Sequence, residues 1–537
     1  MQLARMRTEP TGTALPVLAQ ATWDRLGDEL ITVFEGRRWT AAQLGERSRR
    51  LAGGLRELGV RPGDRVVVCM ANCPEVGVAY HGSWRAGAVV TPVLFLLSED
   101  ELRHVLIDSG ARLALTTPEF LPKMMAAAVA APELLAIVVV GEIAEGMPEE
   151  TRLPVLAFDE LEAGPEAPLH AVDSTGLAAL LYTGGTTGRA KGVMLSHDAL
   201  SAAGWSATVT GVDEDLSVSL LPLPLAHVYG LMISTIQLHV SHPMTSVLMR
   251  WFDPQAWLQL VETERVNTST VVPSMLRVLL DQPLERYDLS ALRRLTSGSA
   301  PLPAEIRTQW ARRAPHVEVA EGYGCTETAA NISTSVLGQA RDGSVGTVSP
   351  IAELAIAVEP ASPPQQLIGV DGEICVRGPM LMSGYWKSPA DTEATITGGW
   401  FHTGDVGHLD ADGYLYIVDR IKDVIIRDGF NIYPRDVEEV LMSHPAVANC
   451  AVVGRPDERH GEEPVAFVQL HPDVPGLATM PDTIRDTLRD YAKAHLSAVK
   501  YPRDIRLIDQ VPVTSVGKLD RKRLRAELDR PPTEPPD

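Results

Sequence analysis

Short, continuously apolar runs alternate with amphipathic stretches along most of this chain, and this alternation constrains its fold more than any other feature. The run RVVVCM at Arg65–Met70 follows a Gly63–Asp64 turn, and LLAIVVV occupies Leu134–Val140. Such runs are typical of strands that are buried on both faces, as in parallel sheets. Between them, Ala41–Leu58 has apolar residues at helical spacing. We therefore predict an α/β fold with mainly parallel sheets that are covered by helices.

The pattern changes after about residue 417, where shorter strands and one helix follow each other closely. The predicted elements are strands at Leu415–Val418, Val424–Ile426, Ala451–Val453 and Ala466–Leu470 and a helix at Pro434–Ser443. A chain of 537 residues is too long for one ordinary core. We predict a large N-terminal domain at residues 1–419, a small mobile α+β domain at 420–528 and a disordered, Pro-rich tail at 529–537.

The chain is strongly acidic, with 48 Lys and Arg residues against 69 Asp and Glu residues and a net charge of −21. A field of this sign repels nucleic acids and anionic membranes. Aromatic residues make up only 5% of the chain, which disfavours a base-stacking surface. We therefore expect no nucleic-acid partner, and any phosphate-bearing ligand must be held by local features.

The cysteines and the apolar segments predict the cellular location of the protein. Five widely spaced cysteines form no CxxC pair, which favours reduced thiols and a cytoplasmic location over a disulfide framework or a zinc site. The N-terminus has two early arginines and no apolar run, so we expect no signal peptide. The most apolar region, residues 124–140, is interrupted by Pro132 and Glu133, whereas a membrane span needs about 20 apolar residues. We therefore predict no membrane span.

The strongest local signal is the segment YTGGTTGRAKG at Tyr182–Gly192, which follows a predicted strand at Leu177–Tyr182. Glycines let backbone N–H groups converge on an anion, threonine hydroxyls add donors, and Lys191 supplies a positive charge. The candidate phosphate contacts are Thr183, Gly184, Gly185, Thr186, Thr187 and Gly188. A kinase-type P-loop is excluded, because a predicted strand follows Lys191. The Thr and Gly density favours a phosphate-binding loop over a plain surface turn.

This segment resembles the signature loop of the acyl-adenylate-forming superfamily, which includes acyl-CoA synthetases, aryl-CoA ligases, luciferases and the adenylation domains of peptide synthetases. The family form reads YTSGTTGxPKG, and here Gly184 replaces the serine and Ala190 the proline, which should loosen the loop slightly. The resemblance extends in the same order from GDRV at Gly63–Val66 to a lysine motif near the C-terminus. Five motifs at family spacing imply the fold and the ligase chemistry of that superfamily.

Two further motifs carry the nucleotide contacts that the resemblance implies for the N-terminal domain. In GYGCTE at Gly322–Glu327, Tyr323 would stack on adenine, Thr326 would contact the α-phosphate and Glu327 would bind Mg²⁺. SGSAP at Ser297–Pro301 would border adenine and the acyl carboxylate. These motifs also place Gly322, Gly324, Ser299 and Ala300 at the nucleotide.

Motifs nearer the C-terminus imply the ribose, hinge and catalytic lysine roles. In HTGD, Asp405 would grip the ribose hydroxyls. In YIVDRIKD, the resemblance places Ile417 and Arg420 at the nucleotide and Lys422 at the domain hinge. In PVTSVGKLDR, Lys518 would reach the acyl carboxylate and the α-phosphate. Each charged residue alone would more often be an ordinary surface group, and their co-occurrence favours the functional roles.

The implied reaction joins a carboxylate to the α-phosphate of ATP, so its barrier is largely the repulsion between two anions. Mg²⁺ on Glu327 would bridge phosphates, the loop with Lys191 would hold the future pyrophosphate, and Lys518 would neutralise the reacting centre. The acyl-adenylate would then be passed to a thiol. By resemblance, the C-terminal domain would swing about Lys422, withdraw Lys518 and present the face that contains Gly429.

Substrate clues come from the segment Pro224–Gly230, which matches the family pattern PxxHxxG. Its His227 would gate the thiol tunnel, and a core histidine is the alternative. Peptide-synthetase domains carry Asp here to pair with an α-ammonium, so His227 predicts an acid without an α-amine. Ala226 stands where an aromatic residue is usual, which should widen the pocket or the thiol tunnel. The predicted pocket contains Ala226, His227, Val228, Gly230, Leu231, Met232, Ser234, Gly298 and Cys325 and favours a medium or bulky aliphatic (fatty) acid, with an aryl or cinnamate-like acid next.

Only 19 residues follow Lys518, too few for a carrier domain, so we expect the thiol acceptor to be a separate molecule. Free CoA is favoured as that acceptor, and a separate acyl carrier protein is the alternative. Retention of Lys191, Glu327, Asp405 and Lys518 argues against an inactive nucleotide-binding scaffold. The sequence leaves open a luciferase-type oxygenation of the adenylate and the oligomeric state, a homodimer included.

Overall fold

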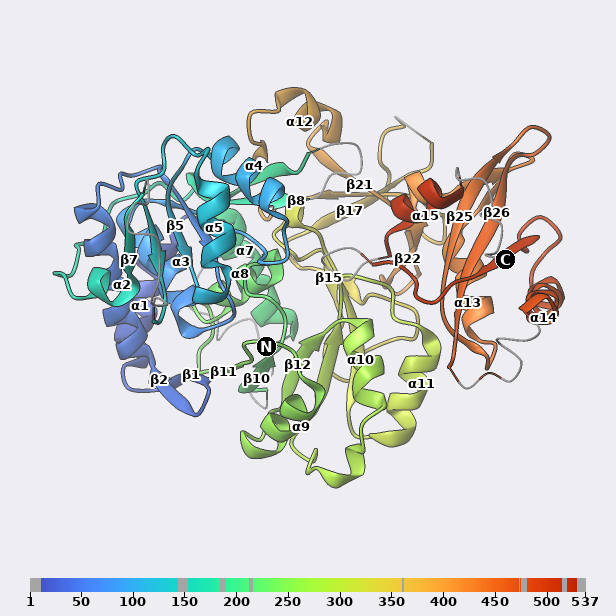
Figure 1. Ribbon diagram of the computed structural model, residues 1–537, viewed down its shortest axis with the longest axis horizontal. Helices are drawn as coiled ribbons and strands as arrows, with labels where there is room; N and C mark the ends of the chain where they lie inside the picture. The colour runs from blue at the N-terminus through green and yellow to red at the C-terminus, as the bar shows by residue number, and fades with distance from the viewer. Residues whose placement is uncertain are drawn as a thin grey trace, which may run out of the picture. The chain divides into compact units, whose positions relative to one another are not determined.

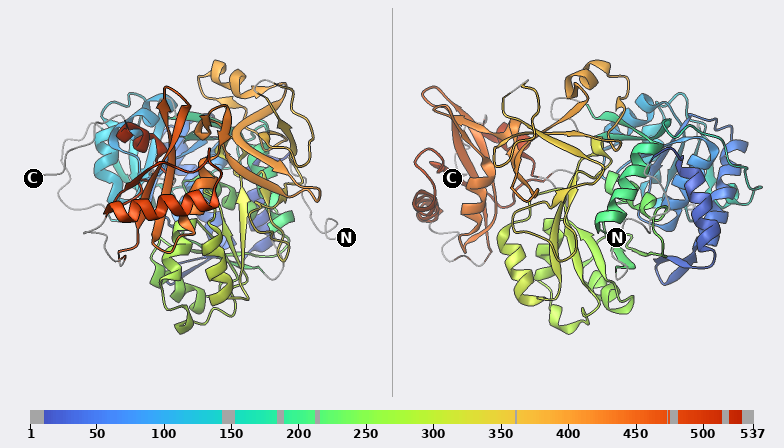
Figure 2. Two further views of the ribbon diagram at one scale, coloured as in Figure 1. Left: turned by 90° about the vertical axis from the view of Figure 1, so that its right-hand side faces the viewer. Right: turned by 180° about the vertical axis from the view of Figure 1, so that it is seen from behind.

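The computed structural model describes residues 11–142, 153–183, 189–211, 216–359, 362–472, 474, 481–513 and 519–528. Contacts between residues divide the chain into two compact units. The first comprises residues 1–302, 309–354 and 376–401, and the second comprises residues 303–308, 355–375 and 402–537. The predictions for residues 184–188, Lys518 and the tail 529–537 lie outside the described residues. Figures 1 and 2 trace the chain from the N-terminus to the C-terminus.

Parallel strands form the centre of one sheet of the first unit, whose order is β16-β15-β14-β13-β12-β10-β11-β1-β2. The pairs from β14 through to β1 are parallel, and antiparallel pairs close both edges. Its strands are β1 (Leu30–Phe34), β2 (Arg37–Thr40), β10 (Val218–Leu221), β11 (Thr245–Leu248), β12 (Thr268–Val271), β13 (Arg294–Ser297), β14 (Glu318–Tyr323), β15 (Ser333–Thr334) and β16 (Thr347–Val348). The carboxyl ends of β12, β13 and β14 therefore meet at one edge, where open α/β sheets bind ligands.

The other sheet of the first unit has the order β19-β9-β8-β4-β3-β5-β6-β7. Its strands are β3 (Arg65–Cys69), β4 (Val89–Pro92), β5 (Ala111–Thr116), β6 (Ala136–Val139), β7 (Val155–Ala157), β8 (Leu177–Thr183), β9 (Lys191–Ser196) and β19 (Gly384–Tyr385). The pairs from β8 to β7 are parallel, whereas β9 pairs antiparallel with both β8 and β19. The apolar runs that predicted strands at residues 65–70, 134–140 and 177–182 are confirmed.

Helices cover these sheets because their central strands are buried on both faces. The helices of the first part of the chain are α1 (Leu15–Leu26), α2 (Ala41–Glu57), α3 (Pro74–Ala86), α4 (Glu99–Ser109), α5 (Leu121–Ala128) and α6 (Phe158–Glu162). One core joins Leu106 of α4 and Met124 of α5 to Val67 of β3 and Ile137 of β6. Helix α2 confirms the amphipathic helix that was predicted at residues 41–58. It begins at Thr40, whose side chain accepts a hydrogen bond from the backbone of the third helical residue.

Two helices of the first unit, α7 (His197–Gly211) and α8 (Val228–Ile236), link the sheets (Figure 1). Helix α7 contacts β8 and β9 of one sheet, and α8 packs against α7. The two helices approach closely, since a Cβ on Gly204 would meet the Oγ1 of Thr235 at 2.4 Å. On its other side, α8 reaches the first sheet through a hydrogen bond between the hydroxyls of Tyr229 and Thr270. Helices α9 (Pro254–Thr263), α10 (Pro273–Leu280), α11 (Ala304–Arg313) and α12 (Pro389–Thr395) complete the helices before residue 400 within the described ranges.

A further sheet follows the order β17-β18-β21-β20, with β22 paired antiparallel to β21. Its strands are β17 (Glu353–Ala357), β18 (Gly372–Arg377), β20 (Ile396–Thr397), β21 (Trp400–Leu409) and β22 (Leu415–Arg420). Strand β22 confirms the strand that was predicted at residues 415–418.

The C-terminal sheet of the second unit has the order β24-β23-β26-β25, with β27 parallel to β26. Its strands are β23 (Ile425–Arg427), β24 (Phe430–Ile432), β25 (Val447–Asp457), β26 (Gly461–Leu470) and β27 (Asp504–Leu507). Helices α13 (Pro434–Met442) and α14 (Pro481–His495) pack on one face, and α15 (Arg521–Leu528) packs on the other (Figure 2). Alternate residues of β25 belong to two hydrophobic cores, one on each face of this sheet. Val452 packs with α13, whereas Ala451 and Val453 pack with Leu524 of α15.

The predicted fold class is confirmed: mainly parallel sheets with helices form a large N-terminal part, and an α+β part follows it. The boundary at residues 419 and 420 stays a prediction, since the contact-based division also assigns residues 402–419 to the second unit. Within the described residues, the structure contains no helix that is both long and apolar enough to span a membrane.

Candidate active site

The predicted phosphate loop joins the two strands of the β8–β9 hairpin. Thr183, the last residue of β8, pairs with Lys191, the first residue of β9, so the ladder holds the lysine directly opposite the threonine. Residues 184–188 between them lie outside the described residues. The residues after Lys191 form a strand, as predicted, so this hairpin differs from a kinase-type P-loop, in which a helix follows the lysine.

Lys191 forms an ion pair that the sequence did not indicate. Its Nζ lies 2.7 Å from Oδ1 of Asp391 in the first turn of α12 and 5.4 Å from the centroid of the Tyr385 ring. The hydrogen bond from Lys191 holds the pKa of the Asp391 carboxyl below its ordinary value. Both side chains are partly exposed, so water weakens the pair.

Glu327, the predicted Mg²⁺ ligand, lies in a short 3₁₀ turn, η4 (Thr326–Thr328), just after β14. Its Oε1 accepts a 2.9 Å hydrogen bond from the hydroxyl of Tyr385. Burial and the charge of Glu327 raise the pKa of Tyr385, so the phenol stays protonated and donates. Tyr385 belongs to β19, which pairs with β9, and its side chain therefore contacts both Lys191 and Glu327.

The carboxyl end of β14 is shaped by tight backbone packing. A Cβ on Gly324 would meet the carbonyl oxygen of Ala330 at 2.2 Å, so this position requires glycine. Ser299 and Ala330 have φ angles of 68° and 75°, a left-handed conformation that costs about 1–2 kcal/mol for each L-residue. Backbone strain of this kind clusters at functional sites. Both strained residues, together with Tyr323 and Gly324, line a cavity beside this strand end.

That cavity has a volume of about 180 Å³ and lies between α8 and the face of β12, β13 and β14. Helix α8 contributes Tyr229, Met232 and Ile236, whose spacing puts them on one side of the helix. The strand side is lined by Thr268, Thr270, Arg294, Thr296, Gly298 and Gly322. An apolar cavity of about 150 Å³ is large enough to bind benzene, so the volume suits one aromatic ring.

His227 lies at the N-terminus of α8 and lines the cavity. Its Nδ1 accepts a 3.4 Å hydrogen bond from the backbone N–H of Tyr229. This contact fixes the ring at the helix start, beside the cavity.

The predicted pocket residues fall into two sets. His227, Val228, Met232 and Gly298 line the 180 Å³ cavity, whereas Ala226, Gly230, Leu231, Ser234 and Cys325 are not among its lining residues. Gly230 has a packing reason instead, because a Cβ there would meet the Cα of Leu225 at 2.4 Å. Leu231 is fully buried, and Ser234 lines a separate cavity of about 100 Å³. Ala226 and Gly230 therefore do not line this cavity, and the widening expected at Ala226 stays a prediction.

The predicted ribose-binding residues lie in the second unit. Asp405 of β21 and Arg420 of β22 are cross-strand partners, and Nε of the arginine lies 3.1 Å from Oδ1 of the aspartate. The arginine side chain is 46% exposed, which leaves it accessible to a ligand, whereas the aspartate is 12% exposed. Ile417 lies on the same strand, and Lys422 follows in η5 (Ile421–Asp423), where burial and then Arg420 lower its pKa. The candidate phosphate contacts around Lys191 belong to the first unit.

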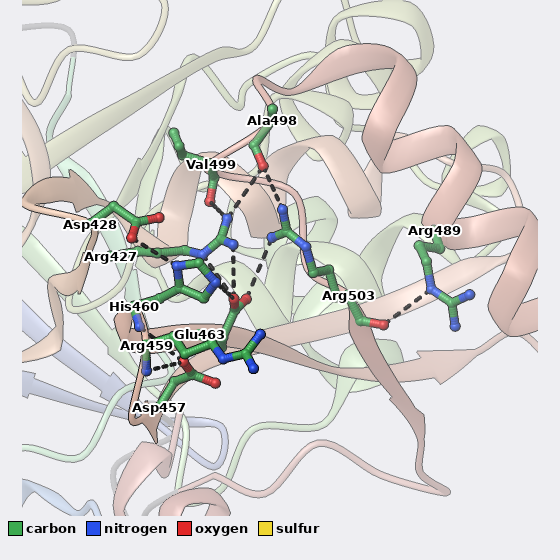
Figure 3. Close-up of polar contacts among 10 residues, drawn as sticks. All are labelled: Arg427, Asp428, Asp457, Arg459, His460, Glu463, Arg489, Ala498, Val499 and Arg503. Atoms are coloured by element: carbon green, nitrogen blue, oxygen red, sulfur yellow. Dashed lines mark hydrogen bonds and ion pairs between the residues drawn. The ribbon is translucent and has the colours of Figure 1, made fainter.

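Gly429 lies at the exposed tip of the β23–β24 hairpin. Asp428 and Gly429 both have positive φ, 51° and 79°, as two-residue hairpin turns favour. Figure 3 shows the polar network behind this tip, in which buried Arg427 lies 2.8 Å from Glu463 and Asp428 lies 2.7 Å from Nδ1 of His460. The hairpin tip is therefore anchored by charged side chains, while Gly429 itself faces solvent.

One group of possible metal ligands was not expected from the sequence. Among the described residues, Glu373, Cys375 and His402 lie close enough together to share an ion. Nδ1 of His402 lies 2.7 Å from Oε2 of Glu373, and this hydrogen bond accounts for the closeness of the two side chains without a metal. All five cysteines are free thiols in this structure.

Three residues of the first unit were missed by sequence reasoning. Tyr385 and Asp391 lie about 200 residues after the phosphate loop, and only the pairing of β19 with β9 brings them to it. Arg294 lies in the cavity lining, before the SGSAP motif. Arg293 and Arg294 are adjacent at the start of β13, and alternation along an extended chain turns one of two adjacent side chains inward.

Residues 19–386 match the family model described as AMP-binding enzyme, and residues 436–518 match the AMP-binding enzyme C-terminal domain. The chain belongs to the AMP-binding enzyme family. It is 37% identical to the feruloyl-CoA synthase of an Amycolatopsis species, over 90% of this chain and 93% of that protein. It is 31% identical to the long-chain-fatty-acid–CoA ligase of Bacillus subtilis, over 94% of this chain and 92% of that protein.

Solved structures of the family agree with this fold. The anthranilate CoA ligase AuaEII in complex with anthranoyl-AMP superimposes with a TM-score of 0.86 at 25% identity, over 97% of this chain and 98% of that one. The superfamily and the AMP-forming acid–thiol ligase class that the motifs implied are thereby confirmed.

Proposed function

We propose that this enzyme activates a carboxylic acid with ATP as an acyl-adenylate, releases pyrophosphate, and transfers the acyl group to CoA. One observation carries the proposal beyond the family match. In the first unit, Lys191, Tyr385 and Glu327 are in contact, and β14 leads from the cavity lined by Tyr323 directly to Glu327. A phosphate-binding cation, a metal-binding carboxylate and an acyl-sized cavity therefore come together.

In the first half-reaction, an oxygen of the acid bonds to the α-phosphorus as the bond from that phosphorus to pyrophosphate breaks. Lys191 holds the departing phosphates, and it gives up its pair with Asp391 to do so. Glu327 would hold Mg²⁺, which when bound supplies positive charge to the phosphates, and the protonated Tyr385 would orient the carboxylate. Lys518, which lies outside the described residues, neutralises the reacting carboxylate and α-phosphate in this proposal.

In the second half-reaction, the sulfur of CoA bonds to the acyl carbon as AMP leaves with the oxygen, and the thiol proton is lost. We propose that the C-terminal domain rotates about Lys422 between the halves, so that Gly429 replaces Lys518 at the site. The charged network behind the β23–β24 hairpin supports this role, because it holds the Gly429 tip in one conformation. Free CoA is the proposed acceptor, and an acyl carrier protein is the alternative.

For the acid we propose an aryl or cinnamate-type substrate, which reverses the order that the sequence favoured. The cavity volume of about 180 Å³ suits one ring, and Gly298 and Gly322 leave the strand side flat opposite Tyr229 and Met232. The names of the Amycolatopsis and anthranilate relatives point to aromatic acids, whereas that of the Bacillus relative points to fatty acids. The position of His227, where an aspartate would pair with an α-ammonium, supports an acid without an α-amine.

The test is ATP–pyrophosphate exchange over a panel of aryl, cinnamic, fatty and amino acids. Thioester formation is then compared with CoA and with a holo acyl carrier protein as the thiol acceptor. We expect exchange with ring-containing acids and thioester formation with CoA. Exchange only with fatty acids would contradict the proposed acid class. Absence of exchange with every acid would instead support an inactive nucleotide-binding scaffold.

A further inference from the structure

Arg294, the first residue of β13, is a buried cation inside the candidate acyl cavity. Its side chain is among the largest that are fully buried, and the residue is 2% exposed. One guanidinium nitrogen, Nη2, donates to the backbone carbonyl of Ser335. Within the described residues, Nε and Nη1 have no hydrogen-bond partner. A guanidinium with two unpaired donors is therefore buried beside a ligand-sized space.

The neighbouring side chains do not neutralise this cation by direct contact. Glu318 is the nearest attractive charge, but its two oxygens accept the backbone N–H groups of Gly338 and Ala340. The hydroxyl of Tyr229 is already hydrogen-bonded to Thr270. A buried charge whose donors are unpaired costs several kcal/mol, and an oxygen acceptor placed at those donors removes most of this cost.

The position of Arg294 along β13 shows which part of a substrate it would meet. Arg294, Thr296 and Gly298 alternate along the chain, so all three lie on the cavity side. Gly298 lies at the carboxyl edge of the sheet, near the Tyr323 and Gly324 strand end. The four residue steps from Arg294 to Gly298 span about 13 Å of extended chain. The guanidinium can lie closer to Gly298 than that, because the arginine side chain is long. Arg294 therefore lies at the end of the cavity that is remote from the reacting carboxylate.

We infer that Arg294 recognises an oxygen acceptor at the far end of the acid. The substrate class is an acid that carries, beyond its ring or chain, a carboxylate oxygen or a neutral hydroxyl, methoxy or carbonyl oxygen. The oxygen accepts from Nε and Nη1 of Arg294 while the reacting carboxylate lies near Gly298. This inference rests on the proposed function, because it assigns the far end of the same cavity.

The test compares cinnamic acid with 4-methoxycinnamic acid and 4-carboxycinnamic acid in the exchange assay on the full-length protein. We expect the intact enzyme to prefer at least one oxygenated acid by about tenfold or more in kcat/KM, because the unoxygenated analogue leaves buried donors unpaired. In Arg294→Met, that ratio should fall close to one. Preference for the carboxy compound would show that Arg294 binds an anionic oxygen, and preference for the methoxy compound would show that it binds a neutral one.

Arg293→Met is the matched control, because Arg293 is the adjacent arginine and is exposed. It should keep the full preference for the oxygenated acid. Retention of the intact ratio in Arg294→Met, or an equal loss in the Arg293 variant, would overturn the inference. Arg294→Lys retains the charge without the planar fork and should restore only part of the preference.

The same variants separate this inference from the proposed function. If exchange occurs with cinnamic acids and kcat/KM is the same with and without the far oxygen, the inference is wrong and the proposed function stands. If no acid supports exchange, the proposed function fails, and the thermal shift that each acid produces without ATP then decides the inference. A shift by the oxygenated acid that disappears in Arg294→Met supports it, and equal shifts in both proteins contradict it.

Discussion

The hydroxyl of Tyr385 donates a 2.9 Å hydrogen bond to Oε1 of Glu327, although the two residues are 58 positions apart in the chain. The bond orients the carboxylate and occupies one of its oxygens. The second oxygen is thereby presented in a defined direction. Loss of a partner that orients a metal ligand typically lowers metal affinity by about 10- to 100-fold.

Tyr385→Phe should therefore weaken the use of Mg²⁺. We expect the Mg²⁺ concentration for half-maximal ATP–pyrophosphate exchange to rise by about tenfold, because the carboxylate loses its orienting donor. The measurement is a Mg²⁺ titration of the exchange rate. Tyr491→Phe removes an equivalent hydroxyl from α14, where it contacts Ser443, and should leave the titration unchanged. An unchanged titration in Tyr385→Phe would refute the proposed role of Tyr385 in orienting a metal-binding Glu327.

Asp391→Asn should strengthen the binding of ATP. The aspartate pairs with Lys191 at 2.7 Å and competes with the phosphates for the lysine. Because exposed pairs are weak, we expect the KM for ATP to fall only about two- to fivefold. Glu393→Gln changes an exposed carboxylate on the same helix and serves as the control for general charge effects. A KM that rises in Asp391→Asn would show that the pair orients Lys191 rather than competing for it.

Lys518→Ala should separate the two half-reactions. We expect adenylation to fall by about 10³-fold or more, because a preorganised charge at the reacting centre is lost. Thioester formation from supplied acyl-adenylate and CoA should be largely retained. Both rates are measured on the same preparation, and Lys522→Ala, an exposed lysine of α15, is the control. Equal loss of both half-reactions would contradict the assigned role.

Buried histidines should make the fold sensitive to acid. Burial lowers the pKa of His197 and of His239 to about 4, below the ordinary value of 6.5. Between these values the unfolded chain binds a proton that the folded chain does not, so the free energy of unfolding falls as the pH drops from 6.5 towards 4. Each histidine contributes about 3 kcal/mol to this loss.

Urea unfolding at about pH 7 and about pH 4.5 measures this effect. His239→Gln, which can still hydrogen-bond to Ser201, should lose less stability on acidification than the intact chain. The exposed His495→Gln variant of α14 should behave like the intact chain. An identical loss in His239→Gln would show that His239 is protonated in the folded state.

The motif residues illustrate how far sequence reasoning reaches at this site. Contiguous motifs located Lys191, Glu327 and His227, because each lies beside the strand end or helix start that its own segment forms. The same reasoning placed Gly230 in the predicted pocket, whereas this residue is not part of the cavity lining. That glycine instead permits the backbone of Leu225 to approach, which is a contact that no local pattern reveals.

The amino-acid sequence by itself determined the α/β class, the buried strands and the identity of the nucleotide motifs, because apolar periodicity and loop chemistry act over a few residues. Only the tertiary structure decided which partners these groups have. Tyr385 and Asp391 reach the β8–β9 hairpin through the pairing of β9 with β19. Arg294 becomes a buried donor because α8 covers its face of the sheet. Strand order and helix packing join residues that are hundreds of positions apart, and these long-range contacts have no signature in any single segment.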